Sequence, residues 1–252
     1  MTEALRVRGL VKRFGGVLAT DHVDLTVIQG QCHAVIGPNG AGKTTLIHQL
    51  SGTLASDAGS VVLNGQDITH WPMHRRVHAG LARSYQITSV FERLSVKDNL
   101  ALALQARSGG LWRWWASARE DRTRFEQAVQ WAERLGLMAF LDHTVGALSH
   151  GQQRQLEVAM ALATEPSVVL LDEPMAGMGP DESQAMLRWL QSIKGQVTLL
   201  LVEHDMDAVF ALADTVSVLV SGRVLVTGTP ADVRQDPEVK AAYLGDEWGS
   251  SA

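Results

Sequence analysis

Short hydrophobic runs rich in β-branched residues dominate roughly the first 70 residues, and they predict strands. The expected strands lie in LRVRGLVKRF, HVDLTVIQG, QCHAVIG and SVVLNGQDI. Asn64-Gly65 lies between two short runs and favours a two-residue hairpin turn. By contrast, TTLIHQLSG predicts a helix that ends near Gly52. The pattern indicates a strand-rich first part with one early helix.

The pattern changes over roughly residues 87–148 and then changes back. The middle is rich in Leu, Ala, Arg, Glu and Gln, and SVKDNLALALQA and RFEQAVQWAERLGL have helical spacing. Afterwards, strand-like runs such as SVVLLDEP and VTLLLVEH alternate with helical segments such as DESQAMLRWLQSI. Such alternation predicts a largely parallel sheet covered on both faces. The expected fold is an α/β core interrupted by a helical insert.

Composition narrows the class of protein. A chain of 252 residues fits one principal domain with an inserted subdomain. Its net charge of −5 gives no overall basic field, which disfavours a nucleic-acid partner. Cys32 is the single cysteine, beside an apolar run, so we expect a packed, inert thiol and a reducing compartment. The N-terminal residues lack a signal-peptide core and the apolar runs are far shorter than ~20 residues, which predicts a cytoplasmic protein.

The clearest chemical motif is GPNGAGKT, which follows an apolar strand and precedes a helix. It matches a P-loop, in which glycines let backbone N–H groups approach phosphate and the helix N-terminus favours anions. Lys43 would reach the β- and γ-phosphates, and the Thr44 hydroxyl would hold Mg²⁺. The expected ATP-binding residues are Gly37, Pro38, Asn39, Gly40, Ala41, Gly42, Lys43, Thr44 and Thr45. The alternative is a glycine-rich turn that matches by chance.

Two carboxylates, Asp172 and Glu173, end the buried run SVVLLDEP. Chemistry in a doubly wound sheet gathers at the carboxyl ends of strands, which predicts that Asp172 lies near the P-loop metal. Neighbouring strand residues point in opposite directions, so Asp172 would support Mg²⁺ while Glu173 polarises the attacking water. The alternative is a solvated acidic turn. One strand later, His204 follows LLLVE, where it could reach a γ-phosphate.

The P-loop, Gln86 in RSYQIT, LSHGQQ, VVLLDEP and His204 stand in an order that resembles the ATP-binding cassette (ABC) ATPases over nearly the whole chain. The resemblance implies a P-loop NTPase with a mostly parallel core sheet, an N-terminal antiparallel β subdomain and an inserted helical subdomain. Residues 1–86 and 149–230 would form the RecA-like core with the β subdomain. Residues 87–148 would form the insert and 231–252 a helical tail of the single domain, 1–252.

The same resemblance implies roles for further residues. In this family two ATPase domains close head to tail on two ATP molecules, and each P-loop faces the signature loop of the other domain. Here LSHGQQ is that loop, so Ser149, Gly151 and Gln152 would contact the nucleotide of the partner. Gln86 would join Thr44 and Asp172 at Mg²⁺ and take part in catalysis with Glu173 and His204. Phe14 would stack on adenine, unless it is an ordinary core residue.

Two positions depart from the family pattern. His150 replaces the first glycine of the common signature Leu-Ser-Gly-Gly-Gln. We expect its side chain to point away from nucleotide rather than to act as a base. Gly179 stands where the loop after DEP usually has an aspartate. In this family that loop carries communication across the dimer, so the missing aspartate would affect it.

Finer resemblance is to the ATPases of branched-chain amino-acid importers, the LivG-type subfamily, in GQQRQLEVAMAL, DEPMAGMGPDE, VEHDM and GTPADVRQDPEVKAAYLGDE. It implies uptake of branched-chain amino acids or a related small polar solute such as urea or an amide. The implied partners are integral-membrane permease subunits, a second ATPase subunit (a sister chain or a second copy) and, indirectly, a periplasmic or extracellular solute-binding protein. The chain would lie on the inner face of the cell membrane.

The insert would contact the permease, and its tip carries Trp112, Trp114 and Trp115. These either pack locally or touch the permease or the membrane interface. Two other functions stay open. One is a lipopolysaccharide-export ATPase, although GQQRQLE and VEHDM favour the importer. The other is a soluble ABC ATPase such as the iron–sulphur-cluster assembly type. A P-loop kinase is disfavoured because it would leave Gln86, the signature and His204 unexplained.

Overall fold

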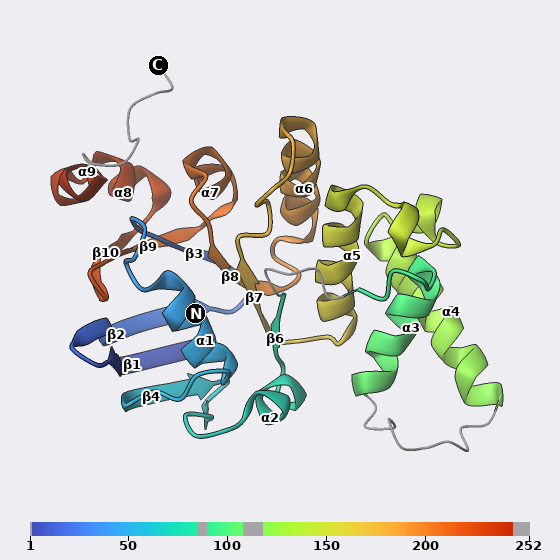
Figure 1. Ribbon diagram of the computed structural model, residues 1–252, viewed down its shortest axis with the longest axis horizontal. Helices are drawn as coiled ribbons and strands as arrows, with labels where there is room; N and C mark the ends of the chain where they lie inside the picture. The colour runs from blue at the N-terminus through green and yellow to red at the C-terminus, as the bar shows by residue number, and fades with distance from the viewer. Residues whose placement is uncertain (1, 85–89, 108–117, 244–252) are drawn as a thin grey trace. The chain divides into compact units, whose positions relative to one another are not determined.

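The computed structural model describes residues 2–84, 90–107 and 118–243, which form two compact units (Figure 1). The sheet unit holds the described residues of Met1–Arg83, Ser167–Glu173 and Leu190–Ala252. The helical unit holds those of Ser84–Pro166 and Pro174–Trp189. Gln86 and the tryptophans at 112, 114 and 115 lie outside the described residues. In the described part, none of the helices is both long and apolar enough to cross a membrane.

The sheet unit begins with an antiparallel four-stranded sheet in the order β2-β1-β4-β5. Its strands are β1 (Glu3–Phe14), β2 (Val17–Ile28), β4 (Ala58–Leu63) and β5 (Gln66–Asp67). The expected hairpin turn is confirmed, since Leu63 pairs with Gln66 across Asn64-Gly65. Asn64 and Gly65 have φ values of 48° and 80°, the left-handed conformation that such a turn requires.

A second sheet has six strands in the order β10-β9-β3-β8-β7-β6. The strands are β3 (Cys32–Ile36), β6 (Leu81–Arg83), β7 (Val168–Asp172), β8 (Thr198–Val202), β9 (Thr215–Val220) and β10 (Arg223–Gly228). All neighbours are parallel except β9 and β10, which confirms the largely parallel core. Because β3, β8 and β7 are adjacent, the residues that follow them meet at one edge of the sheet.

Both faces of the six-stranded sheet are covered, as the alternating strand β3 shows. Val35 packs in a core with helix α1 (Lys43–Ser51) and the antiparallel sheet. Its neighbours Ala34 and Ile36 pack on the other face with residues of α7 (Met206–Leu212), α8 (Pro230–Gln235) and α9 (Pro237–Tyr243). A further helix, α2 (Met73–His78), precedes β6. The expected helix after β3 is α1, which ends at Ser51 with Gly52 as its C-cap, as predicted.

Cys32, at the start of β3, is fully buried. Burial raises the pKa of its thiol to about 12, because the thiolate would lose its hydration inside the core. The reactive form is therefore scarce near neutral pH. This confirms the packed, inert cysteine expected from the sequence.

The C-terminal tail, expected to be helical over residues 231–252, contains two short helices in its described part, α8 and α9. The break lies at Asp236, whose carboxylate accepts hydrogen bonds from the backbone N–H groups of Glu238 and Val239 and so starts a new helix. Pro237 occupies the first position of that helix, where its missing N–H costs nothing.

The helical unit contains α3 (Val96–Arg107), α4 (Ala118–Arg134) and α5 (His150–Ala163), with short 3-10 helices at Met138–Phe140 and Val145–Ala147. Helix α6 (Pro180–Ile193) begins in this unit and ends in the sheet unit. The Trp189 indole N–H donates to the Leu135 carbonyl at 2.7 Å and ties α6 to the end of α4. These helices agree with the helical spacing read from the sequence.

The buried histidine His33 in β3 makes stability depend on pH. It is 1% exposed, and its Nε2 lies 2.8 Å from the Ser217 hydroxyl. Burial lowers its pKa from 6.5 to about 4. Below pH 6.5 the unfolded chain therefore binds a proton that the folded chain does not, so the free energy of unfolding falls as pH falls toward 4. The maximum loss is about 3 kcal/mol, at ~1.4 kcal/mol per pKa unit.

We expect urea unfolding between pH 7 and pH 4.5 to show this loss in the wild type and a shallower slope in His33→Gln. His70→Gln, at an exposed histidine, is the matched control and should keep the wild-type slope. Equal slopes for wild type and His33→Gln would show that His33 does not titrate as its burial requires.

Candidate functional site

The P-loop connects β3 to α1, and two of its glycines have no room for a side chain. Gly37 has φ 155°, and a Cβ there would lie 2.0 Å from the carbonyl oxygen of Leu219. Gly42 has φ 104°, and a Cβ there would lie 2.1 Å from the carbonyl oxygen of Ala19. Side chains would collide with backbone at both positions. The glycines therefore allow the loop to pack tightly between β9 and β2 while keeping its shape.

Lys43 is the first residue of α1, and its ammonium is held by the loop itself. Its Nζ donates to the carbonyls of Gly37 at 2.6 Å and Pro38 at 3.1 Å. Burial lowers its pKa, while the charges of Glu173 and Asp172 act in the opposite direction. Gly42 caps α1 without a side chain, and the first turn holds no acidic residue. A lysine charge beside an open helix N-terminus is an arrangement suited to phosphate.

Asp172 ends β7 and is 2% exposed. Its Oδ2 accepts a hydrogen bond from Arg83 Nη2 at 3.0 Å, an ion pair between buried side chains. Arg83 Nη1 also donates to the Ser51 hydroxyl at the end of α1. Arg83 was not among the residues expected from the sequence. Its only sequence signal is a charged residue at the end of a short apolar run, which gives no partner.

Glu173 leaves the strand direction directly after Asp172. It has φ 46°, a left-handed conformation that is uncommon for a residue with a side chain, and its N–H donates to the Val202 carbonyl at 2.9 Å. Backbone strain of this kind gathers at functional sites. Its side chain is 26% exposed against 2% for Asp172. The two carboxylates therefore occupy different environments, which fits different roles.

His204 follows β8 and lies beside Glu173. Its Nδ1 is 3.9 Å from Glu173 Oε1 and 3.8 Å from Glu203 Oε2, and its side chain is 63% exposed. Glu203 is buried, and it accepts a hydrogen bond from the His204 backbone N–H. The sheet unit thus gathers the P-loop, Asp172, Glu173 and His204 at one sheet edge. This is the edge at which the sequence places them, and their roles in ATP binding and hydrolysis stay predictions.

Phe14 is the last residue of β1, and it is 50% exposed. Lys12 Nζ lies 5.7 Å from the centre of its ring. The alternative in which Phe14 is an ordinary core residue does not hold. Its exposed ring leaves the adenine-stacking role as a prediction.

The signature loop lies in the helical unit, where Ser149 caps α5. The Ser149 hydroxyl accepts from the Gln152 N–H at 3.3 Å, and Gln152 Oε1 accepts from the Ser149 N–H at 3.0 Å. Together they form a capping box. Gly151 N–H donates to Glu182 Oε1 at 3.3 Å. Glu182, in the first turn of α6, is a second residue that the sequence did not single out.

The structure accounts for a histidine at position 150. His150 is exposed, and its Cε1 lies 3.8 Å from the point where a Cβ of Gly177 would stand. Position 151 is different, because a Cβ there would lie 3.1 Å from Glu182 Cβ and Cδ. Position 151 is therefore the closely packed one, against the Glu182 side chain. The side chain at position 150 has room.

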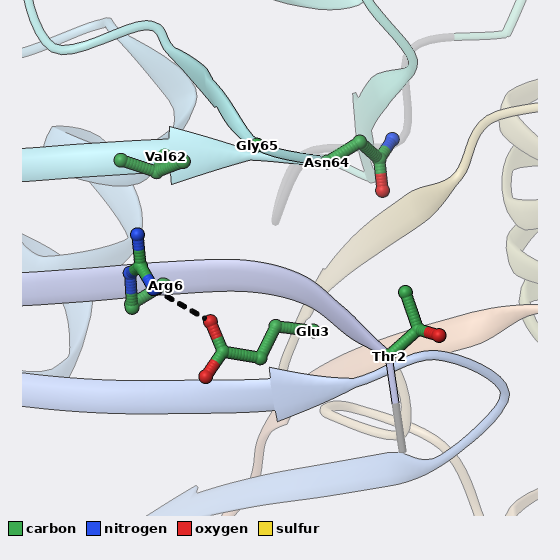
Figure 2. Close-up of a pocket in the computed structure, with 6 residues that line it drawn as sticks. All are labelled: Thr2, Glu3, Arg6, Val62, Asn64 and Gly65. Carbon is green, nitrogen blue, oxygen red and sulfur yellow. Dashed lines mark hydrogen bonds and ion pairs between the residues drawn. The ribbon is translucent and has the colours of Figure 1, made fainter.

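Figure 2 shows a pocket at one end of the antiparallel sheet, which contains the 3.0 Å ion pair between Glu3 and Arg6. The residues that line it are Thr2, Glu3, Arg6, Val62, Asn64 and Gly65. None of these is a P-loop residue or one of the acids and the histidine at the strand ends. We assign the candidate site to that sheet edge and not to this pocket.

The ABC transporter family matches residues 20–176, and the branched-chain amino acid ATP-binding cassette transporter family matches residues 223–248. The chain is 37% identical to the high-affinity branched-chain amino acid transport ATP-binding protein BraF of Pseudomonas aeruginosa, over 96% of this chain and 98% of BraF. It is 34% identical to the high-affinity branched-chain amino acid transport ATP-binding protein LivG of Escherichia coli, over 96% of this chain and 98% of LivG.

The lipopolysaccharide export system ATP-binding protein LptB of Escherichia coli is also 34% identical, over 97% of this chain and 98% of LptB. Among solved structures, an ATP-binding cassette of an ABC transporter in its ADP conformation matches with a TM-score of 0.85 and 30% identity. That match covers 98% of this chain and all of the other. A nucleotide-free cassette matches with a TM-score of 0.84. The chain belongs to the ABC transporter family, as one of its ATP-binding ATPases.

Proposed function

We propose that this chain is the ATPase subunit of an importer for branched-chain amino acids or a related small polar solute. The observation that carries the proposal is the match of residues 223–248 to the branched-chain amino acid transporter family. In the structure these residues begin with β10 and continue through α8 and α9, which pack on the core. The similarity to BraF and LivG over nearly full length supports the same solute class.

ATP would bind at Gly37–Thr45, with its phosphates on the loop amides and the Lys43 ammonium. The backbone carbonyl oxygens that accept from the Lys43 ammonium are uncharged, so they bind it more weakly than phosphate oxygens would. Lys43 can therefore give up these contacts for contacts with the phosphates. Adenine would stack on the exposed Phe14 ring. Thr44 is exposed at the first turn of α1, where its hydroxyl suits a hard cation.

Mg²⁺ would be held by Thr44, with Asp172 and Gln86 as the further residues, and would neutralise charge on the β- and γ-phosphates. Asp172 fits this role as a buried carboxylate whose position is fixed by Arg83. Glu173 would accept a proton from the attacking water. His204, at 3.9 Å from Glu173, would hold water and γ-phosphate in register, and Gln86 would sense the filled site.

A second ATPase subunit would provide the other half of each site through Ser149, Gly151 and Gln152. Closure on ATP would then move permease subunits that contact the helical insert, and hydrolysis would reopen the pair. The chain would lie on the cytoplasmic face of the membrane. A solute-binding protein outside would deliver the solute to the permease.

Lys43→Met tests the P-loop. Methionine keeps most of the buried stem but removes the charge, so we expect ATP affinity and hydrolysis to fall together, each by at least about tenfold. Fluorescent-nucleotide titration of the purified chain measures the affinity. Lys240→Met, at an exposed lysine of α9, is the matched control and should bind as the wild type does. Wild-type affinity in Lys43→Met would contradict the P-loop assignment.

The partner experiment is a mild-detergent purification of the tagged chain from its own cells, followed by identification of every co-purifying protein. We expect polytopic permease subunits, an ATPase subunit and a solute-binding protein. Soluble partners alone, from cells where a control transporter stays intact, would contradict the importer. Recovery of lipopolysaccharide-export components would instead favour the function that LptB carries.

A further inference from the structure

The Glu182 carboxylate lies against hydrogen-bond donors of the signature loop. It lies two residues into α6, and the Gly151 N–H donates to its Oε1 at 3.3 Å. The Ser149 hydroxyl and the Gly179 N–H lie close enough to this carboxylate to favour its negative charge. These groups come from three places in the helical unit: the N-cap of α5, its first turn and the loop before α6. Together they surround a single anionic group.

The environment of Glu182 favours its charged form. The Ser149 hydroxyl is the largest cause, followed by the Gly151 N–H, and these donors hold the pKa of the carboxyl below its ordinary value of 4.5. His150 adds a smaller favourable charge. Glu182 is thus a carboxylate at neutral pH, bound by donors that a phosphate would also use.

Packing confirms that this contact is tight. A Cβ at Gly151 would lie 3.1 Å from both Glu182 Cβ and Cδ, and 3.2 Å from Oε1. A side chain at position 151 would therefore force Glu182 to shift by a few tenths of an ångström. The same glycine is the one that the signature loop would present to nucleotide. The Glu182 carboxylate and a nucleotide phosphate would therefore use the same donors of this loop. They cannot both bind there at once.

We propose that Glu182 is a positioning residue that occupies the signature loop in place of the γ-phosphate and is displaced when the ATP of the opposite subunit arrives. This inference rests on the proposed function, because it requires Ser149 and Gly151 to bind that phosphate. While the loop is empty of nucleotide, the carboxylate keeps its donors paired and oriented. On closure, the repulsion between carboxylate and phosphate raises the ATP concentration that closure requires. Glu182 therefore sets the ATP threshold of the transporter without touching the reacting atoms.

Glu182→Gln tests the proposal in the assembled transporter purified through this chain. Glutamine keeps the size and one acceptor oxygen but removes the charge. We expect the KM for ATP to fall about fivefold, the effect of one charge repulsion in a solvent-accessible site, with kcat within about twofold of wild type. Nucleotide affinity of the isolated chain, which reports on its own P-loop, should not change.

Two further variants separate this role from a general structural one. Asp181→Asn removes the same charge from the neighbouring exposed position of α6 and should leave KM unchanged. Glu182→Asp keeps the charge but shortens the side chain, so the carboxylate loses its hold on the loop and KM should again fall. A KM that is unchanged or raised in both folded Glu182 variants would overturn the proposal.

Failure of this inference differs from failure of the proposed function. If Ser149→Asp strongly lowers turnover but Glu182→Gln leaves KM unchanged, the loop binds phosphate and Glu182 does not compete for it. If Ser149→Asp leaves turnover at the wild-type rate, the loop does not bind phosphate at all. In that case the role of Ser149 is wrong, and the role of Glu182 falls with it.

Discussion

Glu173→Gln should retain ATP binding and lose nearly all ATP turnover. Glutamine has almost the same shape as glutamate, so the unusual backbone conformation at φ 46° and the bond to Val202 remain possible. What disappears is the ability to take a proton from water. General-base catalysis contributes ~10²–10⁴-fold to a rate, so we expect a loss of that order in kcat. The P-loop is untouched, and ATP affinity should stay within about twofold.

The measurement is steady-state phosphate release by the assembled complex, with nucleotide titration of the same preparation. Glu133→Gln, at an exposed glutamate of α4, is the control for loss of one carboxylate and should turn over normally. Steady-state hydrolysis at the wild-type rate in Glu173→Gln would remove Glu173 from the chemistry. A large loss of ATP affinity would show instead that Glu173 acts in binding.

Ser149→Asp should also lower turnover strongly, for an electrostatic reason. Asparagine, aspartate and serine are similarly good helix N-caps, so both Ser149→Asp and Ser149→Asn should keep α5 capped and folded. Aspartate adds a negative charge where the γ-phosphate of the opposite ATP would lie. Two unit charges at about 4 Å repel by ~1–4 kcal/mol in a partly exposed site, which corresponds to roughly fivefold to nearly a thousandfold in rate.

Comparing the two variants isolates this charge. We expect Ser149→Asn to keep a substantial part of the wild-type ATPase rate, while Ser149→Asp falls far below it. In Ser149→Asp the new carboxylate also faces that of Glu182, so thermal unfolding measures any loss of stability and the ATPase rates are compared at a temperature where both variants are folded. Equal ATPase rates in the aspartate and asparagine variants would mean that no phosphate approaches the signature loop.

Local sequence predicted the parts of the site that depend on local structure. The P-loop glycines, the strand-end acids and His204 were identified because each follows a recognisable apolar run, and parallel strands bring their carboxyl ends to one edge. The Asn64-Gly65 turn and the Gly52 helix end were predicted for the same reason, since the required left-handed conformation favours these residues. Here sequence neighbours are also spatial neighbours.

Long-range pairs were not predictable in this way. Arg83 and Asp172 are 89 positions apart, and the loop and α6 meet through Gly151 and Glu182 at a separation of 31. Buried Arg154 likewise donates to the Pro174 carbonyl, 20 positions away, which joins α5 to the loop after DEP. A charged residue in a helix or strand has no sequence signal for a distant partner. Only the packing of distant segments decides which charges meet.

The most direct test of the central claim is uptake of radiolabelled leucine by cells whose own copy of this chain is replaced. Cells with the wild-type chain should accumulate leucine, and cells with Glu173→Gln should lose the energy-dependent part of that uptake. Uptake of a solute carried by an unrelated system should be the same in both strains and controls for general effects on energy supply. Leucine, isoleucine and valine uptake that is undiminished in the Glu173→Gln strain would contradict the assignment of this ATPase to a branched-chain amino-acid importer.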